Sequence, residues 1–471
     1  MATIVHTVRP MVSFSKEGMI RRLAHAAVVT GFVGTDVPDW LARRIDAGLG
    51  GVCWFAQNVE DESQAATLAR ALHGRGPVLV MADEEGGDIT RLEATTGSSY
   101  PGHAALGALD DGHATRRVAA AMGQCLRTVG VDVALAPVVD VNADPENPVI
   151  GVRSFGAAPD VVARHGAAFV TGLQGAGVAA CAKHFPGHGS TRTDSHLALP
   201  TVADPVEVLR ERDLVPFRAV VEAGVRCVMT AHVVFAAYDA EPATLSSVLL
   251  GLLRQDLGFD GVVITDALDM KAISAGVGHA EGAVRSLAAG ADLLCIGNPG
   301  YPEIYDADAR VGLVVDAVVA AVEQGRLNVE RLEQAAARVA ALRAWLQWEP
   351  AGAVEDAGDV AARAVTRRGD VRVTRPRVVD LGGAVNIAAG DRDRHLRDLL
   401  EVHAGDGRLV VLARHPSQLA ELADLVGRHP HAVVVWSGID VEVPGDHVVL
   451  THGGGRAVAE VAADLVLGEG R

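Results

Sequence analysis

The sequence predicts a (β/α)₈ barrel, the TIM-barrel fold, followed by a small parallel α/β sandwich domain. Eight short apolar runs recur between residues 27 and 296, and each is followed by a longer stretch with helical spacing. Continuous rather than alternating hydrophobicity indicates strands that are buried on both faces. Polar residues gather at the C-terminal ends of several runs, where a barrel keeps its active site, so a barrel is favoured over an open doubly wound sheet.

The predicted barrel strands come first along the chain. They are residues 27–32, 51–55, 78–83, 133–137, 179–184, 227–232, 261–266 and 291–296. Residues 313–348 are expected to form a terminal helix pair, because apolar residues such as Val314, Val318 and Val322 recur at helical spacing. The catalytic barrel is therefore expected to span residues 1–348.

A second domain is expected after a linker at residues 349–356, which begins with Glu349 and Pro350. Three further strand candidates follow, at residues 408–412, 432–436 and 447–450. Helical stretches separate them, which predicts a small parallel α/β domain over residues 357–471. No motif in this domain carries recognisable chemistry. A chain of 471 residues is also too long for one ordinary core.

Composition narrows the class of protein. A formal net charge of −17 opposes binding to nucleic acid or to an anionic membrane. The five cysteines lack CxxC spacing and four lie in apolar runs, which indicates reduced core thiols in a reducing compartment. The N-terminus lacks a basic start before a long apolar stretch, and no segment reaches about 18 apolar residues. We expect a cytoplasmic protein without a membrane span or a nucleic-acid partner.

The segment from Lys183 to His196 has the richest chemistry. It follows the predicted fifth strand and holds one lysine, three histidines, one aspartate and two glycines. Only three of the 42 basic residues are lysine, so a lysine at this strand end is unusual for the chain. Lys183 and His184 are placed to hold ligand hydroxyls at the barrel mouth. Gly187 and Gly189 would let the following loop bend or move over a ligand.

Asp194 and His196 are two positions apart, so a turn could bring the carboxylate to one imidazole nitrogen. Such a contact would fix the ring tautomer and raise its basicity, leaving the other nitrogen to transfer a proton. A solvated polar loop, in which Asp194 and Ser195 cap a helix, explains the same spacing equally well.

Asp266 directly follows the predicted seventh strand and would lie at the rim of a barrel active site. There it could act as a nucleophile that forms a covalent glycosyl intermediate. It could instead be an ordinary helix N-cap. Asp269 competes for the nucleophile role, but it is expected to begin the following helix.

Three acids, Asp83, Glu84 and Glu85, follow the predicted third strand. No matching histidine spacing lies nearby, so we expect hydroxyl recognition and no metal site. Arg153 follows the fourth strand and could supply a rigid bidentate fork. His232, at the end of the sixth strand, could contact a ligand or could be a hydrogen-bonded core histidine, and the second interpretation is favoured.

Together these residues resemble glycoside hydrolase family 3, in particular its bacterial exo-β-N-acetylglucosaminidase branch of the muropeptide-recycling type. The resemblance covers residues 20–345. Its motifs are KHFPGHG at 183–189, DSH at 194–196, NPVIGxRSFG at 147–156, AHV at 231–233 and LRQDLGFDGVVITDALDM at 253–270. It also implies a second domain of the family type, here a short one.

The resemblance implies a retaining exo-β-N-acetylglucosaminidase that removes terminal β-GlcNAc from small glycosides and needs no cofactor. Asp266 matches the nucleophile, and His196 matches the general acid/base, paired with Asp194 on a mobile loop. The positions that match binders of the non-reducing sugar are Asp83, Arg91, Arg153, Lys183 and His184.

Three departures from the family pattern concern the aglycone. Glu84 stands where the family often has Gln, Asp88 where it often has Arg, and Ser190 where many members have Asp. These changes leave open whether the substrate carries a peptide.

Several functions stay open beside hydrolysis of GlcNAc glycosides. A neutral imidazole does not repel an incoming anion, so inorganic phosphate could accept the glycosyl group and yield a sugar 1-phosphate. A β-glucosidase and a non-catalytic sugar-binding barrel would also fit the fold, but the joint presence of Asp266, Asp194 and His196 opposes the sugar-binding barrel.

Overall fold

The computed structural model describes residues 15–347, 355–382 and 395–468. Its larger sheet has eight strands in the order β10-β1-β2-β3-β4-β5-β7-β9, and all neighbouring strands run parallel. These strands are β1 (Val28–Thr30), β2 (Gly51–Trp54), β3 (Leu79–Ala82), β4 (Val133–Ala134), β5 (Ala179–Phe185), β7 (Cys227–Thr230), β9 (Val262–Thr265) and β10 (Leu294–Cys295). Each overlaps one predicted run.

A bridge between Ile264 and Leu293 joins the two ends of this sheet, so the barrel is nearly closed. Alternate strand residues face inward and fill the barrel with side chains such as Val29, Met81 and Met229. Cys53, Cys181, Cys227 and Cys295 belong to this filling, and all five cysteines of the chain are free thiols. The predicted (β/α)₈ barrel is therefore confirmed, and most of the cysteines pack in its core.

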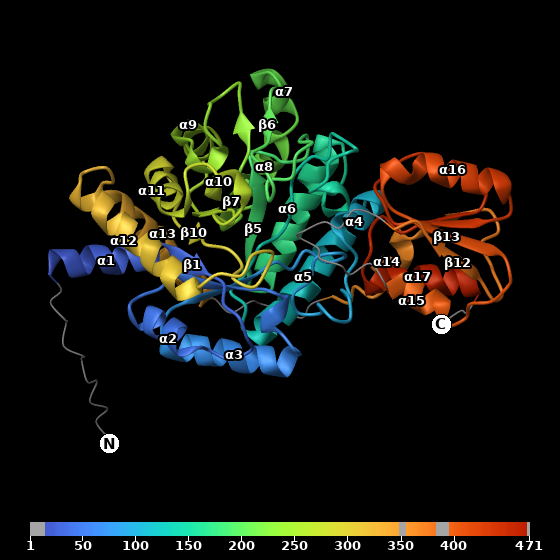
Figure 1. Ribbon diagram of the computed structural model, residues 1–471, viewed down its shortest axis with the longest axis horizontal. Helices are drawn as coiled ribbons and strands as arrows, with labels where there is room; N and C mark the ends of the chain where they lie inside the picture. Colours follow the sequence, from blue (N-terminus) through green and yellow to red (C-terminus); the bar gives the residue numbers. More distant parts are fainter. Residues whose placement is uncertain (1–14, 348–354, 383–394, 469–471) are drawn as a thin grey trace.

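Helices surround the barrel (Figure 1). They are α1 (Lys16–Ala26), α2 (Asp39–Asp46), α3 (Glu62–Arg75), α4 (His103–Leu109), α5 (Gly112–Val129), α6 (Pro159–Gly175), α7 (Val206–Glu211), α8 (Leu214–Glu222), α9 (Ser247–Gly251), α10 (Lys271–Ser274), α11 (His279–Ala289), α12 (Ala307–Glu323) and α13 (Val329–Leu346). A short parallel pair, β6 (Thr201–Val202) and β8 (Val234–Phe235), lies outside the barrel sheet. The predicted terminal helix pair corresponds to α12 and α13. Val339 and Leu342 of α13 pack against the inward-facing strand residues.

Helix α5 shows why the sequence makes helices here. The side chain of Asp111 accepts hydrogen bonds from the backbone nitrogens of His113 and Ala114, at 3.0 and 3.1 Å, which caps the first turn. The helix ends at Gly130, whose φ of 84° lies in the left-handed region that favours glycine. Its buried residues include Ala114, Val118, Met122 and Leu126, spaced four apart, so one face packs on the barrel.

The C-terminal region forms a second sheet of five strands in the order β11-β15-β14-β13-β12. The strands are β11 (Thr366–Arg368), β12 (Arg377–Asp380), β13 (Leu409–Ala413), β14 (Val433–Trp436) and β15 (Val448–Leu450). Its helices are α14 (Val360–Ala364), α15 (His395–Glu401), α16 (Leu419–Arg428) and α17 (Arg456–Leu467). Helix α16 packs on one face, and the other three cover the opposite face (Figure 1).

The small sheet differs from the prediction at both edges. Strands β13, β14 and β15 correspond to the three predicted strands and are parallel as expected. The sheet has one more strand at each edge that was not predicted: β12 pairs parallel with β13, and β11 pairs antiparallel with β15. All three residues of β11 are exposed, so this strand has no apolar pattern that would reveal it. The expected linker at residues 349–356 lies mostly outside the described residues, and the domain boundaries stay a prediction.

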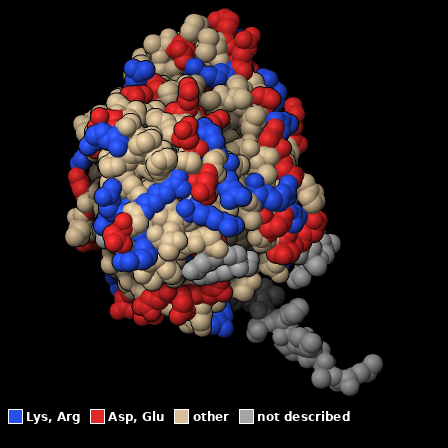
Figure 2. Space-filling view, turned by 90° about the vertical axis from the view of Figure 1, so that its right-hand side faces the viewer, with Lys and Arg blue, Asp and Glu red and all other residues tan. Residues whose placement is uncertain are grey.

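Both basic and acidic side chains occur over the face seen in Figure 2. Oppositely charged side chains also pair along exposed helices of the structure, for example Arg428 with Asp424 at 2.6 Å in α16. Within residues 15–347, 355–382 and 395–468, no helix is long and apolar enough to cross a membrane.

Candidate active site

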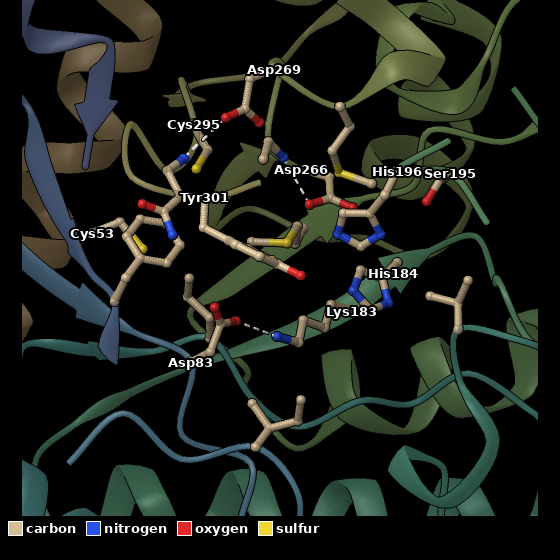
Figure 3. Close-up of a pocket in the computed structure, with 18 of the residues that line it drawn as sticks. Cys53, Asp83, Lys183, His184, Ser195, His196, Asp266, Asp269, Cys295 and Tyr301 are labelled. Carbon is tan, nitrogen blue, oxygen red and sulfur yellow. Dashed lines mark hydrogen bonds and ion pairs between the residues drawn. The ribbon is translucent and has the colours of Figure 1, made fainter. Parts of the chain in front are cut away.

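A cavity of about 350 Å³ opens at the C-terminal ends of the barrel strands. Its lining includes seven of the eight residues predicted for the site: Asp83, Arg91, Arg153, Lys183, His184, His196 and Asp266. The eighth, Asp194, is hydrogen-bonded to His196. Figure 3 shows Asp266 and His196 on one side of this cavity, with Lys183 and Asp83 across from them. A barrel places strand-end residues of several strands together in this way.

Lys183 lies at the centre of a buried ionic network. Its side chain is 2% exposed, and its Nζ lies 2.7 Å from Asp83 Oδ1 and 2.8 Å from Glu85 Oε1. Burial by itself would lower the pKa of Lys183, but the two carboxylates raise it above its usual value, so the amine is charged. Arg91 Nη2 lies 3.2 Å from the other oxygen of Asp83.

Glu85 is a site residue that the sequence did not single out from its acidic neighbours. Arg153 binds it bidentately, with Nε 3.0 Å from Oε2 and Nη2 2.8 Å from Oε1. Burial would raise the pKa of Glu85, but Arg153 and Lys183 hold it well below its usual range. Glu84 does not line the cavity, and its Oε2 accepts from the backbone nitrogens of Arg91 and Leu92, at 2.9 and 3.1 Å. Of the three acids, Asp83 and Glu85 therefore reach the cavity.

Asp140 is a second site residue that the sequence did not reveal. Its Oδ2 lies 2.8 Å from His184 Nδ1, and its Oδ1 accepts from the backbone nitrogens of His184 and His188 at 3.2 and 2.7 Å. Burial opposes ionisation of Asp140, yet the nearby histidines lower its pKa, so it is a carboxylate and His184 Nδ1 is the donor. The only hint in the sequence was that Asp140 is a single acid directly after the apolar residues Pro137–Val139.

The predicted pairing of Asp194 and His196 is present. His196 Nδ1 lies 2.7 Å from Asp194 Oδ1, and that oxygen also accepts from the His196 backbone nitrogen at 2.8 Å. Burial would lower the pKa of His196, but the hydrogen bond and the charge of Asp194 raise it above its usual value. Residues 194–198 form a turn that starts no helix, so the helix-cap interpretation is wrong.

The loop between Lys183 and His196 is held by several hydrogen bonds. His188 Nδ1 lies 2.8 Å from Thr191 Oγ1, and His188 Nε2 lies 2.9 Å from Ser195 Oγ. Gly189 packs against the strand-end backbone, because a Cβ there would lie 1.9 Å from the carbonyl oxygen of Val141. This glycine therefore allows close packing, and the expected mobility of the loop stays a prediction.

Asp266 directly follows β9. Its Oδ1 accepts from the Ala267 nitrogen at 2.7 Å. Burial would raise its pKa, but His232, His184 and His196 lower it below the usual value, so Asp266 is ionised at neutral pH. The next helix, α10, begins only at Lys271, so the N-cap interpretation is wrong.

His232 supports the backbone at this position. Its Nδ1 lies 2.7 Å from Thr244 Oγ1, and its Nε2 donates to the carbonyl oxygen of Ala267 at 2.9 Å. It is fully buried and does not line the cavity. The interpretation of His232 as a hydrogen-bonded core histidine is therefore confirmed.

Asp269 does not begin the following helix, which corrects that expectation. It lines the cavity, and its Oδ2 accepts from the Asn298 nitrogen at 3.0 Å and from the Tyr305 hydroxyl at 3.3 Å. Gly297 makes room for it, because a Cβ there would lie 2.0 Å from Asp269 Oδ2. Burial raises the pKa of Asp269 to about 6.

The ends of the barrel strands carry ionised carboxylates, a histidine–aspartate pair and buried cationic groups. This combination is typical of a hydrolytic enzyme with a barrel fold. Residues 33–342 match the glycosyl hydrolase family 3 N terminal domain. The chain belongs to glycosyl hydrolase family 3.

Individual relatives agree with this family. The chain is 35% identical over 337 residues to β-hexosaminidase A of Pseudoalteromonas piscicida, an alignment that covers 66% of this chain and 56% of the relative. It thus spans little more than half the length of that protein. It is 38% identical over 283 residues to a β-hexosaminidase of Thiobacillus denitrificans, which covers 58% of this chain and 78% of the relative.

The fold of the whole chain also has a solved counterpart. A family 3 β-N-acetylglucosaminidase from Paenibacillus is 31% identical, with a TM-score of 0.79, and the match covers 95% of this chain and 96% of the other. The C-terminal domain is thus part of the similarity. The predicted family, fold and glycoside hydrolase class are confirmed.

Proposed function

We propose that the protein is a retaining exo-β-N-acetylglucosaminidase that removes terminal β-GlcNAc from small glycosides. The observation that carries this proposal is that Asp266 and His196 face one cavity, with Asp194 hydrogen-bonded to His196, beside a buried network suited to sugar hydroxyls. The relatives named β-hexosaminidase and the solved β-N-acetylglucosaminidase support the choice of sugar.

The first chemical step forms a bond from Asp266 to the sugar. The ionised Asp266 carboxylate attacks the anomeric carbon, and His196 Nε2 donates its proton to the glycosidic oxygen, so the aglycone leaves as an alcohol. Asp194 holds Nδ1–H and stabilises the charged imidazole before transfer.

The second step releases the sugar. Neutral His196 takes a proton from a water molecule, the water oxygen attacks the anomeric carbon, and the bond to Asp266 breaks. The GlcNAc that leaves has the configuration of the substrate, because the carbon has been displaced twice.

The cavity floor favours removal of one terminal sugar. Cys53, Leu135 and Met229 line the cavity and also belong to the apolar filling of the barrel. A saccharide can therefore enter only from the mouth. We propose that Asp83, Arg91, Arg153, Lys183 and His184 bind its hydroxyls. Polar groups fixed by such ionic contacts need little rearrangement when the sugar arrives.

Replacing Asp194 by asparagine should shift the alkaline limb of the pH profile of kcat/KM to lower pH. The charge of Asp194 raises the pKa of His196, and the reactive form in the first step is protonated His196. The acidic limb, which follows ionisation of Asp266, should stay in place. The profile should be measured with an alkyl GlcNAc glycoside, whose departure needs the acid. An unmoved alkaline limb would show that Asp194 does not tune His196.

Phosphorolysis is the second candidate, favoured by the use of a histidine as acid/base. A neutral imidazole leaves an incoming phosphate unopposed, so phosphate could take the glycosyl group from Asp266 and yield GlcNAc 1-phosphate. We expect hydrolysis, with free GlcNAc as the main product with and without phosphate. The products should be separated after incubation of a GlcNAc glycoside in both conditions. GlcNAc 1-phosphate as the main product would make the enzyme a phosphorylase.

The same assay distinguishes GlcNAc hydrolysis from glucoside hydrolysis and from simple sugar binding. A panel that pairs GlcNAc and glucose glycosides should show faster turnover of the GlcNAc members. Preference for glucose would indicate a β-glucosidase, and no turnover of any member would indicate a sugar-binding protein.

The free cysteines are compatible with the proposed reducing, cytoplasmic location.

A further inference from the structure

The C-terminal domain contacts the barrel at the loop that carries sugar-binding candidates. The turn after β15, residues 451–455, lies against the loop after β3, residues 83–102. The backbone nitrogen of Gly454 donates to Asp88 Oδ1 at 2.6 Å. Figure 1 shows the C-terminal domain next to α4, which directly follows this loop.

Beside this hydrogen bond, the backbones of the two loops also approach each other closely. A Cβ at Gly455 would lie 2.8 Å from the carbonyl oxygen of Gly87, and a Cβ at Gly87 would lie 3.7 Å from the carbonyl oxygen of Gly454. Both glycines also have positive φ, 89° and 57°. A side chain at Gly455 would clash with the Gly87 backbone, which gives this glycine of the run at residues 453–455 a physical role.

Two further bonds extend the contact along the same loop. Arg456 Nη2 lies 2.6 Å from Glu93 Oε1, and the Ala457 nitrogen donates to the Ser98 carbonyl oxygen at 3.0 Å. The C-terminal domain therefore holds the β3 loop both before and after Arg91.

Asp88 lies in a tight turn of this loop, between two charged residues that line the cavity. Residues 86–89 form a tight turn, in which the nitrogens of Glu85 and Gly86 donate to the Ile89 carbonyl oxygen at 3.0 and 3.1 Å. Glu85 lies just before the turn and Arg91 just after it. Fixing Asp88 therefore limits the positions that both charged side chains can take in the cavity.

We propose that the C-terminal domain is a positioning element for the sugar-binding side of the active site. Through Gly454 and Gly455 it anchors the turn at Asp88. This anchoring keeps Asp83, Glu85 and Arg91 in the positions in which they form the ionic network around Lys183. Asp88 touches no substrate in this proposal and acts through its neighbours. The expected effect on catalysis rests on the proposed function.

The test replaces Asp88 by alanine, which removes the acceptor for Gly454. KM for an aryl GlcNAc glycoside should rise about tenfold while kcat changes little, because contacts to non-reacting hydroxyls act equally in the bound and transition states. Asp88→Asn keeps an acceptor oxygen and should restore most of the affinity. Arg363→Ala is the matched control, because it breaks another contact between the domains, the 2.6 Å pair with Asp111, away from the β3 loop.

A second measurement does not depend on the substrate. Amide hydrogen exchange of residues 83–93 should be faster in Asp88→Ala than in the wild type and unchanged in Arg363→Ala. Unchanged exchange, or an equal rise in KM with Arg363→Ala, would overturn the proposal. If the wild type turned over no GlcNAc glycoside, the proposed function would fail, while the exchange result would still decide the positioning role. Thermal unfolding of each variant checks that the fold is intact.

Discussion

Replacing Asp266 by alanine should lower kcat for aryl GlcNAc glycosides by about 10⁴-fold or more. The nearby acid Asp269 cannot take its place, because Asp269 faces the Asn298 nitrogen and the Tyr305 hydroxyl. Without the nucleophile the covalent intermediate cannot form, and water would have to attack the anomeric carbon of the glycoside directly. Steady-state rates with a chromogenic aryl glycoside measure the loss.

Two controls sharpen this prediction. Asp269→Asn removes the charge of the other acid in this part of the cavity, and we expect it to lose at most about tenfold, since it does not form the intermediate. Added azide should partly restore turnover of an activated aryl glycoside by Asp266→Ala and give the α-glycosyl azide, because a single displacement inverts the anomeric carbon. Near-normal activity of Asp266→Ala, or equal losses in both variants, would overturn the nucleophile assignment.

The barrel was predictable because burial dominates its strands. Runs such as Gly51–Trp54 and Val262–Thr265 are buried at every position, and that burial leaves a continuous apolar signal. The strand β11 at Thr366–Arg368 leaves none, because it is exposed and its register is set by a partner, β15, far along the chain. A run of apolar residues in the sequence indicates a strand only when that strand is buried, so an exposed edge strand is not detected in this way.

The site divides along the same line. Lys183, His184 and Asp266 stand at strand ends, and their exposure to the cavity follows from the barrel itself. Asp140 was missed because its partner His184 lies 44 positions away in sequence. Asp269 was misplaced because the space it occupies is left by a distant glycine, Gly297. Residues whose roles depend on contacts distant in sequence need the folded chain to be recognised.

Replacing His196 by alanine should impair poor and good leaving groups unequally. For an alkyl GlcNAc glycoside, kcat/KM should fall about 10³-fold, because the departing alkoxide must be protonated as it leaves. For a dinitrophenyl glycoside, the fall should be about tenfold or less, since that phenolate leaves without a proton. The quantity to compare is kcat/KM, which reports the first step, because loss of His196 as a base also slows release from Asp266.

The matched control for this prediction is Arg192→Ala. Arg192 lies on the same loop, but its side chain is 78% exposed and pairs with Asp144 outside the cavity lining, so kcat/KM should be nearly unchanged with both substrates. If His196→Ala slowed alkyl and dinitrophenyl glycosides by the same factor, the loss would come from distortion of the loop, and another group would have to be the acid. The alternative result is that His196→Ala lowers kcat/KM much more for the alkyl glycoside than for the dinitrophenyl glycoside, while Arg192→Ala changes neither. That result would assign the difference to proton transfer by His196, because both substrates bind through the same sugar.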